Sequence, residues 1–383
     1  MTADEATARQ NARQFPHVRV EGEPFERGSQ YGVQTRDRIA LSIQAYERVF
    51  AFYTGWDWTA VKRASLAYVP PIEAAYPSYL DEMRGIASGA GVEFEDILAL
   101  NIRTEIMYSA KARMAAGSHP AVTRECSSFL VMPEASSNGH LLAGENWDWL
   151  PHCSDTVVVL EASQDAKPNF VTVVEAGLLA KAGMNSAGLC LATNALVTDA
   201  DRGEPGIPYH VLLRALLDAG TMTEALASVQ RWTRSSSANY LLAHEDGVGV
   251  DVEAEPGDFQ RVHFLTASDG LVVHTNHFLS TLRDARDVSL WAMPDSLVRL
   301  QRLDTALRAA RPVSVKALQE MLMDHADYPF GVCSHPDLRA DPAEQGATIM
   351  SIIMEPISRK VWLADGFPCT TPYRELDYSG FLS

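Results

Sequence analysis

Residues 124–131 read Arg124-Glu125-Cys126-Ser127-Ser128-Phe129-Leu130-Val131 and join a polar loop to an apolar strand. The preceding stretch, 112–125, combines glycine, serine and proline with small and charged residues, which is typical of an exposed connection. After Cys126 the pattern predicts a strand, a turn at residues 136–139 and a second strand that leads into residues 144–149. A cut before Cys126 would therefore leave a cysteine as a new amino terminus at the start of a hairpin.

The residues before Cys126 are predicted to be mainly helical. A short strand is expected at residues 18–20, followed by Pro24 in the first turn of a helix. Apolar residues then recur at three- and four-residue steps from Ile39 to Tyr53, which indicates an amphipathic helix. Further helical stretches are expected around residues 80–86 and 94–100, and residues 1–14 are expected to form a polar tail.

After Cys126 the pattern alternates between strands and pairs of helices. The predicted strands and hairpins lie at 156–160, 170–174, 184–196, 240–252, 262–275, 348–354 and 360–363. The predicted helices begin near 208 and at Thr221, where Glu224 completes a capping box, and include 297–307 and 318–323. This order predicts an α+β fold; it suits two sheets between helical layers, and periodicity alone also allows other α+β layouts.

Four motifs occur in a fixed order along the chain. They are Glu125-Cys126-Ser127-Ser128-Phe129, Asn146-Trp147-Asp148-Trp149, Gly183-Met184-Asn185-Ser186-Ala187-Gly188-Leu189 and His274-Thr275-Asn276-His277. Together they resemble the penicillin acyltransferase-like family of N-terminal nucleophile hydrolases. The resemblance implies a four-layer αββα sandwich formed as one domain. It also implies that residues 126–383 are the mature catalytic chain and that residues 1–125 are a cleaved but tightly associated smaller subunit.

The chemistry of a cysteine at an amino terminus can be argued without the resemblance. A thiol attacks a carbonyl as its thiolate, and an unperturbed cysteine with a pKa of ~8.5 is only a few per cent ionised near neutral pH. The α-amine of an N-terminal Cys126 titrates near ~7.7–8 and lies within reach of the thiol, so it can take the proton. One residue then supplies both nucleophile and base. The alternative for Cys126 is an inert thiol buried at the start of a strand.

The resemblance implies roles for the residues around this nucleophile. Asp148 matches the aspartate that orients the α-amine, and Asn276 matches the asparagine that stabilises the tetrahedral oxyanion. The backbone N–H near Ser127 is expected to be a second oxyanion donor. In self-cleavage, Cys126 attacks the carbonyl of Glu125 and water resolves the thioester. Taken separately, Asp148 also fits a turn residue and Asn276 a strand-end cap.

The residues expected to bind substrate are Glu145, Trp147, Asn194 and Ser127. Glu145 stands where the family more often has glutamine, and a carboxylate so near the nucleophile predicts a preference for a cationic or amine-bearing substrate. Asn185 is expected to shape a turn beside glycine rather than to contact substrate.

Other residues depart from the family pattern or leave two interpretations open. Asn101, Arg103 and Glu105 match a family Asn-x-Arg-x-Glu run, which predicts either an ion pair that supports the smaller subunit or a substrate contact. Glu125 stands where the penicillin-forming member has glycine. The expected arginine near Ser334 is absent from the sequence, which argues against a clamp for a substrate carboxylate.

Composition and cysteine spacing argue against several other classes of protein. The net charge of −17, without a basic stripe or a phosphate-binding glycine loop, argues against nucleic acid and anionic membranes as partners. Five widely spaced cysteines indicate reduced thiols in the cytoplasm, and neither a signal peptide nor a stretch of ~20 apolar residues is present in the sequence. The pairs His274/His277 and Cys333/His335 do not have zinc-ligand spacing, so no metal or other cofactor is predicted.

The sequence therefore predicts an autoprocessing N-terminal cysteine amidohydrolase, expressed as a precursor, that cleaves a linear N-acyl or aminoacyl amide through a thioacyl-enzyme. Acyl transfer to an amine is the close alternative, because a thioester partitions between water and a bound amine. An uncleaved, non-catalytic binding protein of the same fold is the third possibility. The expected partners are the small-molecule amide and the protein's own cleaved segment, and the sequence is compatible with a homo-oligomer.

Overall fold

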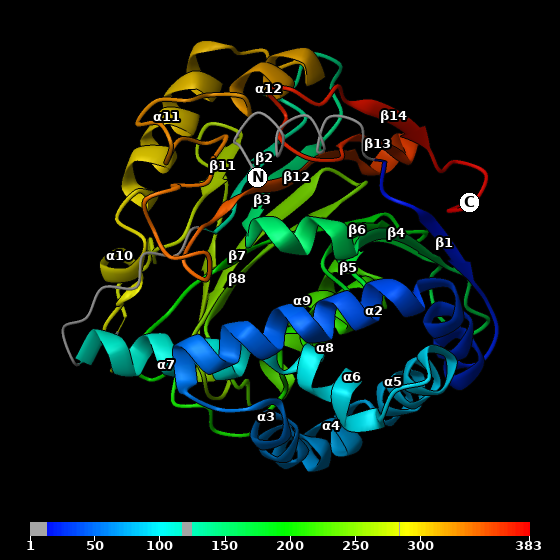
Figure 1. Ribbon diagram of the computed structural model, residues 1–383. Helices are drawn as coiled ribbons and strands as arrows, with labels where there is room; N and C mark the ends of the chain where they lie inside the picture. The colour runs from blue at the N-terminus through cyan, green and yellow to red at the C-terminus, as the bar shows by residue number, and fades with distance from the viewer. Residues whose placement is uncertain (1–13, 117–124, 283) are drawn as a thin grey trace.

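Two sheets face each other in the middle of the molecule, and helices cover the outer face of each (Figure 1). The computed structural model describes residues 14–116, 125–282 and 284–383. Within these residues the layers form an αββα sandwich. This arrangement confirms the α+β class and the layer order that the sequence predicted.

The larger sheet begins with a strand from the N-terminal segment. Its described strands, in spatial order, are β1 (His17–Val20), β4 (Val157–Ala162), β5 (Phe170–Glu175), β6 (Ala182–Asn185), β7 (Leu189–Ala195), β8 (Ala238–His244), β9 (Val248–Ala254) and β10 (Val262–Leu265). β1 pairs with β4 in parallel, whereas the other described pairs are antiparallel. Both sides of the predicted cleavage point therefore contribute to one sheet.

The smaller sheet carries the strand that follows Cys126. Its described strands, in spatial order, are β11 (Leu271–His274), β2 (Ser127–Val131), β3 (Leu142–Trp149), β12 (Ala347–Glu355), β13 (Lys360–Ala364) and β14 (Arg374–Asp377), all antiparallel. Every residue of β2, β3 and β12 is buried, because one face meets the larger sheet and the other meets helices. Polar side chains on these strands must therefore find partners inside the protein.

The helices form two groups. The larger sheet is covered by helices that include α2 (Pro24–Thr54), α3 (Trp58–Ser65), α4 (Val69–Ala75), α5 (Pro77–Ala90), α6 (Phe94–Asn101), α7 (Arg103–Ala116), α8 (Tyr209–Leu217) and α9 (Met222–Arg231) (Figure 1). The smaller sheet is covered by α11 (Ser296–Ala309) and α12 (Val315–Met321), and the short α10 (Ser289–Ala292) contacts α7. Leu303 and Leu307 of α11 and Leu318 of α12 pack on Phe129 and Val131 of β2. None of the described helices is long and apolar enough to cross a membrane.

Two glycines allow α2 and α5 to pack closely. A side chain on Gly28 would meet the backbone of Glu82, and one on Gly85 would meet the backbone of Phe25. The two backbones therefore approach more closely than residues with a Cβ would permit. The capping box at the start of α2, formed by Glu23 and Glu26, satisfies exposed N–H groups beside Pro24.

Three sequence predictions need correction. Residues 262–275 do not form a hairpin, because β10 pairs with β9 in the larger sheet while β11 pairs with β2 in the smaller one. The turn at Asp269-Gly270 instead carries the chain from one sheet to the other, since Leu271 and Val273 find their apolar contacts against α11 and α12. The predicted loop at 112–125 is helical as far as Ala116. Residues 117–124, and residues 1–13 of the predicted tail, lie outside the described residues.

The third correction concerns the start of α9. Thr221 accepts a hydrogen bond from the Glu224 amide at 3.2 Å, as predicted, but the Glu224 carboxylate accepts from the amide of Gly220 rather than that of Thr221. The Glu224 carboxylate therefore binds the backbone amide of the residue before the N-cap.

Candidate active site

Cys126 lies directly before β2, and the pairing of β2 with β3 brings two of the sequence motifs together. Ser127 lies opposite Asn146, and Ser128 lies opposite Glu145. The opposing face of the larger sheet contributes β7, from which Asn194 accepts a hydrogen bond from Ser128. The site is thus built between the two sheets.

The Cys126 thiol faces a lysine that the sequence analysis did not single out. Lys181, the residue before β6, places its Nζ 3.6 Å from Cys126 Sγ. The Cys126 side chain is 1% exposed. Burial raises the pKa of the thiol, and the nearby Lys181 ammonium only partly offsets this. In the uncut chain the thiol is therefore held in its protonated form.

Lys181 is held in turn by a buried carboxylate. Its Nζ lies 3.7 Å from Glu145 Oε1, and Glu145 Oε2 accepts a hydrogen bond of 2.6 Å from the amide of Thr193. Burial alone would lower the pKa of Lys181, but its interactions with the Cys126 thiol and the Glu145 carboxylate outweigh burial, and the pKa is raised. The ring of Trp147 lies 5.3 Å from the same ammonium. Lys181 is thus a buried cation between the thiol and Glu145.

The backbone carbonyl of Cys126 is bound from both sides of the sandwich. Asn194 Nδ2 donates to it at 2.9 Å, and Arg299 of α11 donates to it at 3.0 Å. Arg299 also donates to Ser127 Oγ at 2.9 Å and to Asn276 Oδ1 at 2.9 Å, and its Nε donates to Asp295 at 2.7 Å. Arg299 is fully buried, so its forked hydrogen bonds fix the backbone at Cys126. We call Cys126, Lys181, Glu145, Asn194 and Arg299 the nucleophile cluster.

Asn276 is part of this network but does not touch Cys126 in the uncut chain. Its Nδ2 donates to the carbonyl of Ala195 at 3.0 Å, and its Oδ1 is held by Arg299. The amide that an oxyanion would need is therefore directed at a backbone carbonyl here. Its role as an oxyanion donor stays a prediction.

Asp148 is completely buried on β3. Its Oδ1 accepts a hydrogen bond of 2.5 Å from Thr348, whose hydroxyl in turn accepts from the amide of Ser334 at 2.9 Å. Its negative charge is one of those that raise the pKa of Cys126. The carboxylate therefore lies close enough to Cys126 to interact with a charge there.

Glu125, on the other side of the predicted scissile bond, is also fixed. Its Oε1 lies 3.0 Å from Lys111 Nζ of α7, and both side chains are buried. The residue before the nucleophile is therefore anchored to the N-terminal segment.

The fold brings most of the predicted site residues together. Cys126, Glu145, Asn194 and Ser127 are in direct hydrogen-bonding or ionic contact with one another or with Lys181 and Arg299. Trp147 lies against Lys181, and Asn276 joins through Arg299. Asp148 is bound by Thr348 and acts on Cys126 through its charge. Asn185 donates to the carbonyls of Leu217 and Ala219, a structural role in line with the prediction. Its side chain is not in the nucleophile cluster.

Sequence reasoning missed Lys181 and Arg299, although each left a signal. Lys181 is a single charge in the apolar run from Leu178 to Met184. Arg299 lies four and eight residues before Leu303 and Leu307, on the buried stripe of α11. A charge at a core position needs a buried partner, and that is a reason to suspect a site.

The run Asn101, Arg103 and Glu105 joins the N-terminal segment to the rest of the chain. Arg103 forms a buried ion pair of 2.7 Å with Glu175 and stacks on Trp149 at 4.5 Å. Asn101 donates to the carbonyl of Gly177, and Glu105 accepts from the amide of Tyr209. The structure therefore favours the supporting ion pair over a substrate contact.

The two histidine and cysteine pairs weighed as metal ligands have different surroundings. His274 and His277 do not share a partner, since His274 contacts Glu253 at 2.9 Å and His277 contacts Ser296 at 2.7 Å. The fold adds His325 and Cys369 to Cys333 and His335, and the four ligand atoms lie within 4.8 Å of one another. Spacing along the chain did not reveal this group, because its members come from separate loops. We call these four residues the four-ligand cluster.

Comparison with known proteins gives one family match and two relatives. The family described as acyl-coenzyme A:6-aminopenicillanic acid acyl-transferase matches residues 135–368, a range that includes Glu145, Asp148 and Asn276 but begins after Cys126. The 40 kDa form of acyl-coenzyme A:6-aminopenicillanic-acid-acyltransferase from Emericella nidulans is 25% identical over 352 residues, covering 92% of this chain and 93% of that protein. An uncharacterized protein of Archaeoglobus fulgidus is 27% identical over 325 residues, covering 72% of this chain and 53% of that protein.

Two solved structures are more distant. A variant of conjugated bile acid hydrolase from Clostridium perfringens has a TM-score of 0.47 at 11% identity, covering 67% of this chain and 93% of that one. Penicillin V acylase from Agrobacterium tumefaciens has a TM-score of 0.42 at 14% identity, covering 67% and 88% respectively. The fold described above stands on its own strands and helices rather than on these likenesses.

Proposed function

The chain belongs to the acyl-coenzyme A:6-aminopenicillanic acid acyl-transferase family, and within it we propose an amidohydrolase that activates itself by cutting between Glu125 and Cys126. The observation that carries the proposal is the enclosure of Cys126: Lys181 contacts its thiol, while Asn194 and Arg299 bind its carbonyl. An inert core thiol needs neither a buried cation nor two donors on its backbone carbonyl. These groups support a reactive cysteine at a fixed position.

Self-cleavage begins with the thiol and the peptide bond before it. Sγ of Cys126 bonds to the carbonyl carbon of Glu125, the carbon–nitrogen bond breaks, and the thiol proton ends on the nitrogen of Cys126. Water then cleaves the resulting thioester, which leaves a carboxylate on Glu125 and a free thiol on Cys126. Because burial keeps the thiol protonated in the uncut chain, this first reaction is expected to be slow.

Cleavage supplies the base that the uncut chain lacks at this position. The new α-amine of Cys126 has an ordinary pKa near ~7.7–8, so it can accept the thiol proton when substrate binds. Asp148 is the proposed partner that orients this amine, since its charge already acts on Cys126. The thiolate attacks the amide carbonyl, the amine leaves with a proton, and water releases the acyl group from sulfur.

The N-terminal segment is proposed to remain bound after the cut. Besides Arg103 with Glu175, Glu82 of α5 forms a buried ion pair of 2.7 Å with Arg214 of α8. Separating the two segments would expose or strand these charges, at a cost of about 3–5 kcal/mol for each broken buried pair. The mature enzyme is thus expected to be a stable two-chain complex.

Glu145 is proposed to set the charge of the site rather than to bind a cation from the substrate. Its carboxylate already contacts Lys181 and accepts from Thr193. The pair is neutral overall, which removes the reason to expect a cationic substrate. A neutral linear N-acyl amide fits this site, and a Glu145→Gln variant is expected to leave the ratio of activity on charged and neutral amides unchanged. A shift of that ratio toward neutral amides would restore the cationic interpretation.

Acyl transfer is the second candidate, and the family and the Emericella nidulans relative favour it by name. Both reactions pass through the same thioester and differ in whether water or an amine resolves it. Incubating the mature enzyme with an N-acyl amide and an added amine distinguishes them. Free acid as the main product supports hydrolysis, whereas a new amide of the added amine supports transfer.

The first test is the intact mass of the purified protein under denaturing conditions, beside a Cys126→Ala control. Two fragments that meet between Glu125 and Cys126, present only in the unmodified protein, are the expected result. One full-length mass in both proteins, even after long incubation, would contradict self-cleavage. Covalent labelling then separates an enzyme, with one fast thiol at Cys126, from a binding protein with five uniformly slow ones.

A further inference from the structure

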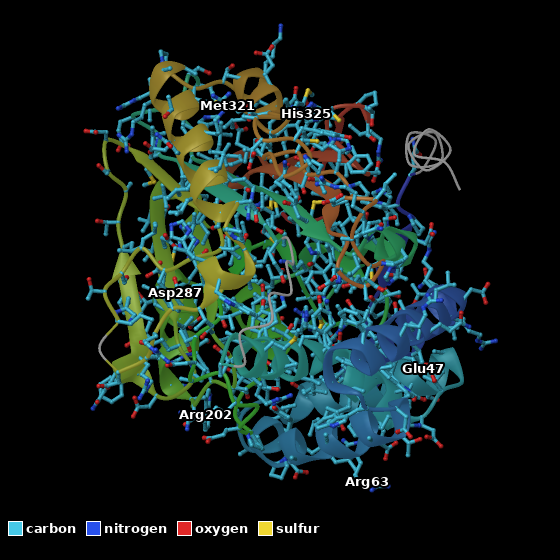
Figure 2. All side chains as sticks on the ribbon, turned by 60° about the vertical axis from the view of Figure 1, so that its left-hand side comes forward. Glu47, Arg63, Arg202, Asp287, Met321 and His325 are labelled. Atoms are coloured by element: carbon cyan, nitrogen blue, oxygen red, sulfur yellow. The ribbon has the colours of Figure 1, made fainter. Side chains whose placement is uncertain are left out.

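The four-ligand cluster lies at the outer end of the smaller sheet, away from the helices that cover the larger one. His325 follows α12, Cys333 and His335 lie in the loop after it, and Cys369 follows β13. Figure 2 shows His325 beside Met321 of α12 and far from Arg63 of α3. The cluster brings together donors from three separate places in the chain between His325 and Cys369.

The distances within the cluster centre on one nitrogen. His335 Nε2 lies 3.1 Å from His325 Nε2, 3.5 Å from Cys369 Sγ and 3.7 Å from Cys333 Sγ. A tetrahedral zinc ion with bonds of about 2.0–2.3 Å places its ligand atoms roughly 3.3–3.8 Å apart. The three separations from His335 Nε2 match the edges of that tetrahedron to within a few tenths of an ångström, and all four ligand atoms lie within 4.8 Å of one another.

From this geometry we propose that the four-ligand cluster binds one zinc ion. Two thiolates and two imidazoles are the donor set of structural zinc sites, and two thiolates balance the charge of the ion. Four protein ligands leave no open position for water or substrate, so the ion is structural rather than catalytic. Cys333 is buried and His325 is exposed, which gives the ion an entry path from the His325 side.

The backbone around the cluster already holds the ligands in place. The amide of Cys333 donates to the carbonyl of Asp324 at 2.9 Å, and the amide of His335 donates to the carbonyl of Pro329 at 2.9 Å. The His335 ring stacks on Phe367 at 4.3 Å, two residues before Cys369. The loop after α12 and the loop after β13 therefore meet at the cluster. An ion there would link the two loops through its coordinate bonds.

The same loop supports the Asn-Trp-Asp strand of the candidate active site. Asn146 donates to the carbonyls of Leu322 and Val332 at 2.9 and 2.8 Å. Ser334, between two of the proposed ligands, exchanges hydrogen bonds with Thr348, which donates to Asp148. The zinc ion would thus stabilise the wall that positions Asp148 without taking part in the reaction.

The experiment is elemental analysis of untagged full-length protein, purified without chelator and measured by plasma mass spectrometry. About one zinc per chain is expected for the unmodified protein, and a loss to background for Cys369→Ser. Cobalt reconstitution should add sulfur-to-metal charge-transfer absorption in the near ultraviolet, together with visible bands of a tetrahedral ion. Both signals should be absent in Cys369→Ser.

Because His325 is exposed, replacing it removes one proposed ligand without disturbing the packed core. His325→Ala should transfer zinc to a chelator at least about tenfold faster, the lower end of the loss seen when even an outer partner of a metal ligand is removed. The matched control is His140→Ala, a partly exposed histidine that contacts Glu355, and Cys190→Ala controls for loss of a buried thiol. Both should retain one zinc.

Three outcomes would overturn the site. One is a zinc content near zero that zinc reconstitution does not raise. Another is stoichiometric zinc in Cys369→Ser. The third is a two-hydrogen mass deficit mapped to peptides that contain Cys333 and Cys369, since a disulfide between them would replace the ion.

Discussion

The nucleophile cluster and the four-ligand cluster both bring cysteine sulfur together with nitrogen, but they do so in opposite ways. At Cys126 the chain supplies its own countercharges, since Lys181 faces the thiol and Glu145 faces Lys181. At Cys333 and Cys369 the groups that converge are all electron-pair donors. A sulfur beside a cation within the chain is suited to chemistry, whereas sulfurs that share a centre with imidazoles are suited to an ion from outside.

The sharpest test of this contrast is a crossed pair of variants. Cys126→Ala should abolish self-cleavage and lower kcat on the order of a million-fold, the scale seen when a catalytic nucleophile is removed, while zinc content stays unchanged. Cys369→Ser should lose zinc and still cleave itself. Intact mass measures cleavage and elemental analysis measures zinc in each of the two variants. Loss of cleavage and zinc together in either variant would show that the two clusters are not independent.

The buried countercharges of the nucleophile cluster predict the next largest effect. Lys181→Met removes the partner of Glu145 and should lower the free energy of unfolding by about 3–5 kcal/mol, because a carboxylate is left buried and unpaired. Chemical denaturation measures this loss. In the double variant Lys181→Met/Glu145→Gln most of the stability should return. A double variant as unstable as the single one would mean that packing of the lysine, not charge, is what matters.

Replacing Arg299 is expected to affect the reaction rate more than the stability of the fold. Arg299→Lys keeps a positive charge beside Asp295 but loses the fork that binds Cys126, Ser127 and Asn276. A misplaced nucleophile should lower kcat by roughly a hundredfold with little change in KM. Arg308→Lys, on the exposed part of the same helix, is the matched control and should be silent. If Arg299→Lys lowers the free energy of unfolding enough to account for its loss of kcat, the role of Arg299 is purely structural.

The buried pair of His274 and Glu253 borders the nucleophile cluster and predicts a pH effect. Burial opposes both shifts, yet Asp251 and Glu253 raise the pKa of His274 above 6.5, and His274 lowers the pKa of Glu253 below 4.5. The stability from His274 is complete below its unfolded pKa and is lost as pH rises through its raised folded pKa. The stability from Glu253 is present above its unfolded pKa and is lost as pH falls through its lowered folded pKa. The pair therefore contributes most to the free energy of unfolding between pH 4.5 and pH 6.5.

Denaturation of the unmodified protein and of Glu253→Gln measures this pair. The variant should lose about 1 kcal/mol near pH 6 and less near pH 9, because the stability from the pair falls as pH rises through the raised pKa of His274. The neighbouring His277 hydrogen-bonds Ser296, and the charge of His274 helps to lower the pKa of His277 after burial. An equal loss at both pH values would mean that the hydrogen bond, not the charge on His274, carries the stability.

Much of the fold followed from local patterns because they act over a few residues. Strands flanked by turn residues were placed correctly at β1, β5, β8 and β9, and the long helix after Pro24 begins where proline fits. The predicted hairpin at 262–275 failed because its turn is equally able to reverse a strand or to change sheets. Which of these occurs depends on where Leu271 and Val273 find apolar partners, and those partners lie on α11 and α12.

The sequence by itself determined the fold class, the family and the position of the candidate nucleophile, because ordered motifs and periodicity are properties of the chain. Only the tertiary structure decided that Lys181 faces Cys126, that Arg299 binds the carbonyl beside it, and that Glu145 is already paired. It also brought Cys369 to His335. The physical reason is the same in each case: a buried charge or a ligand atom finds its partner across space, and spacing along the chain does not record distances between sheets, helices and loops.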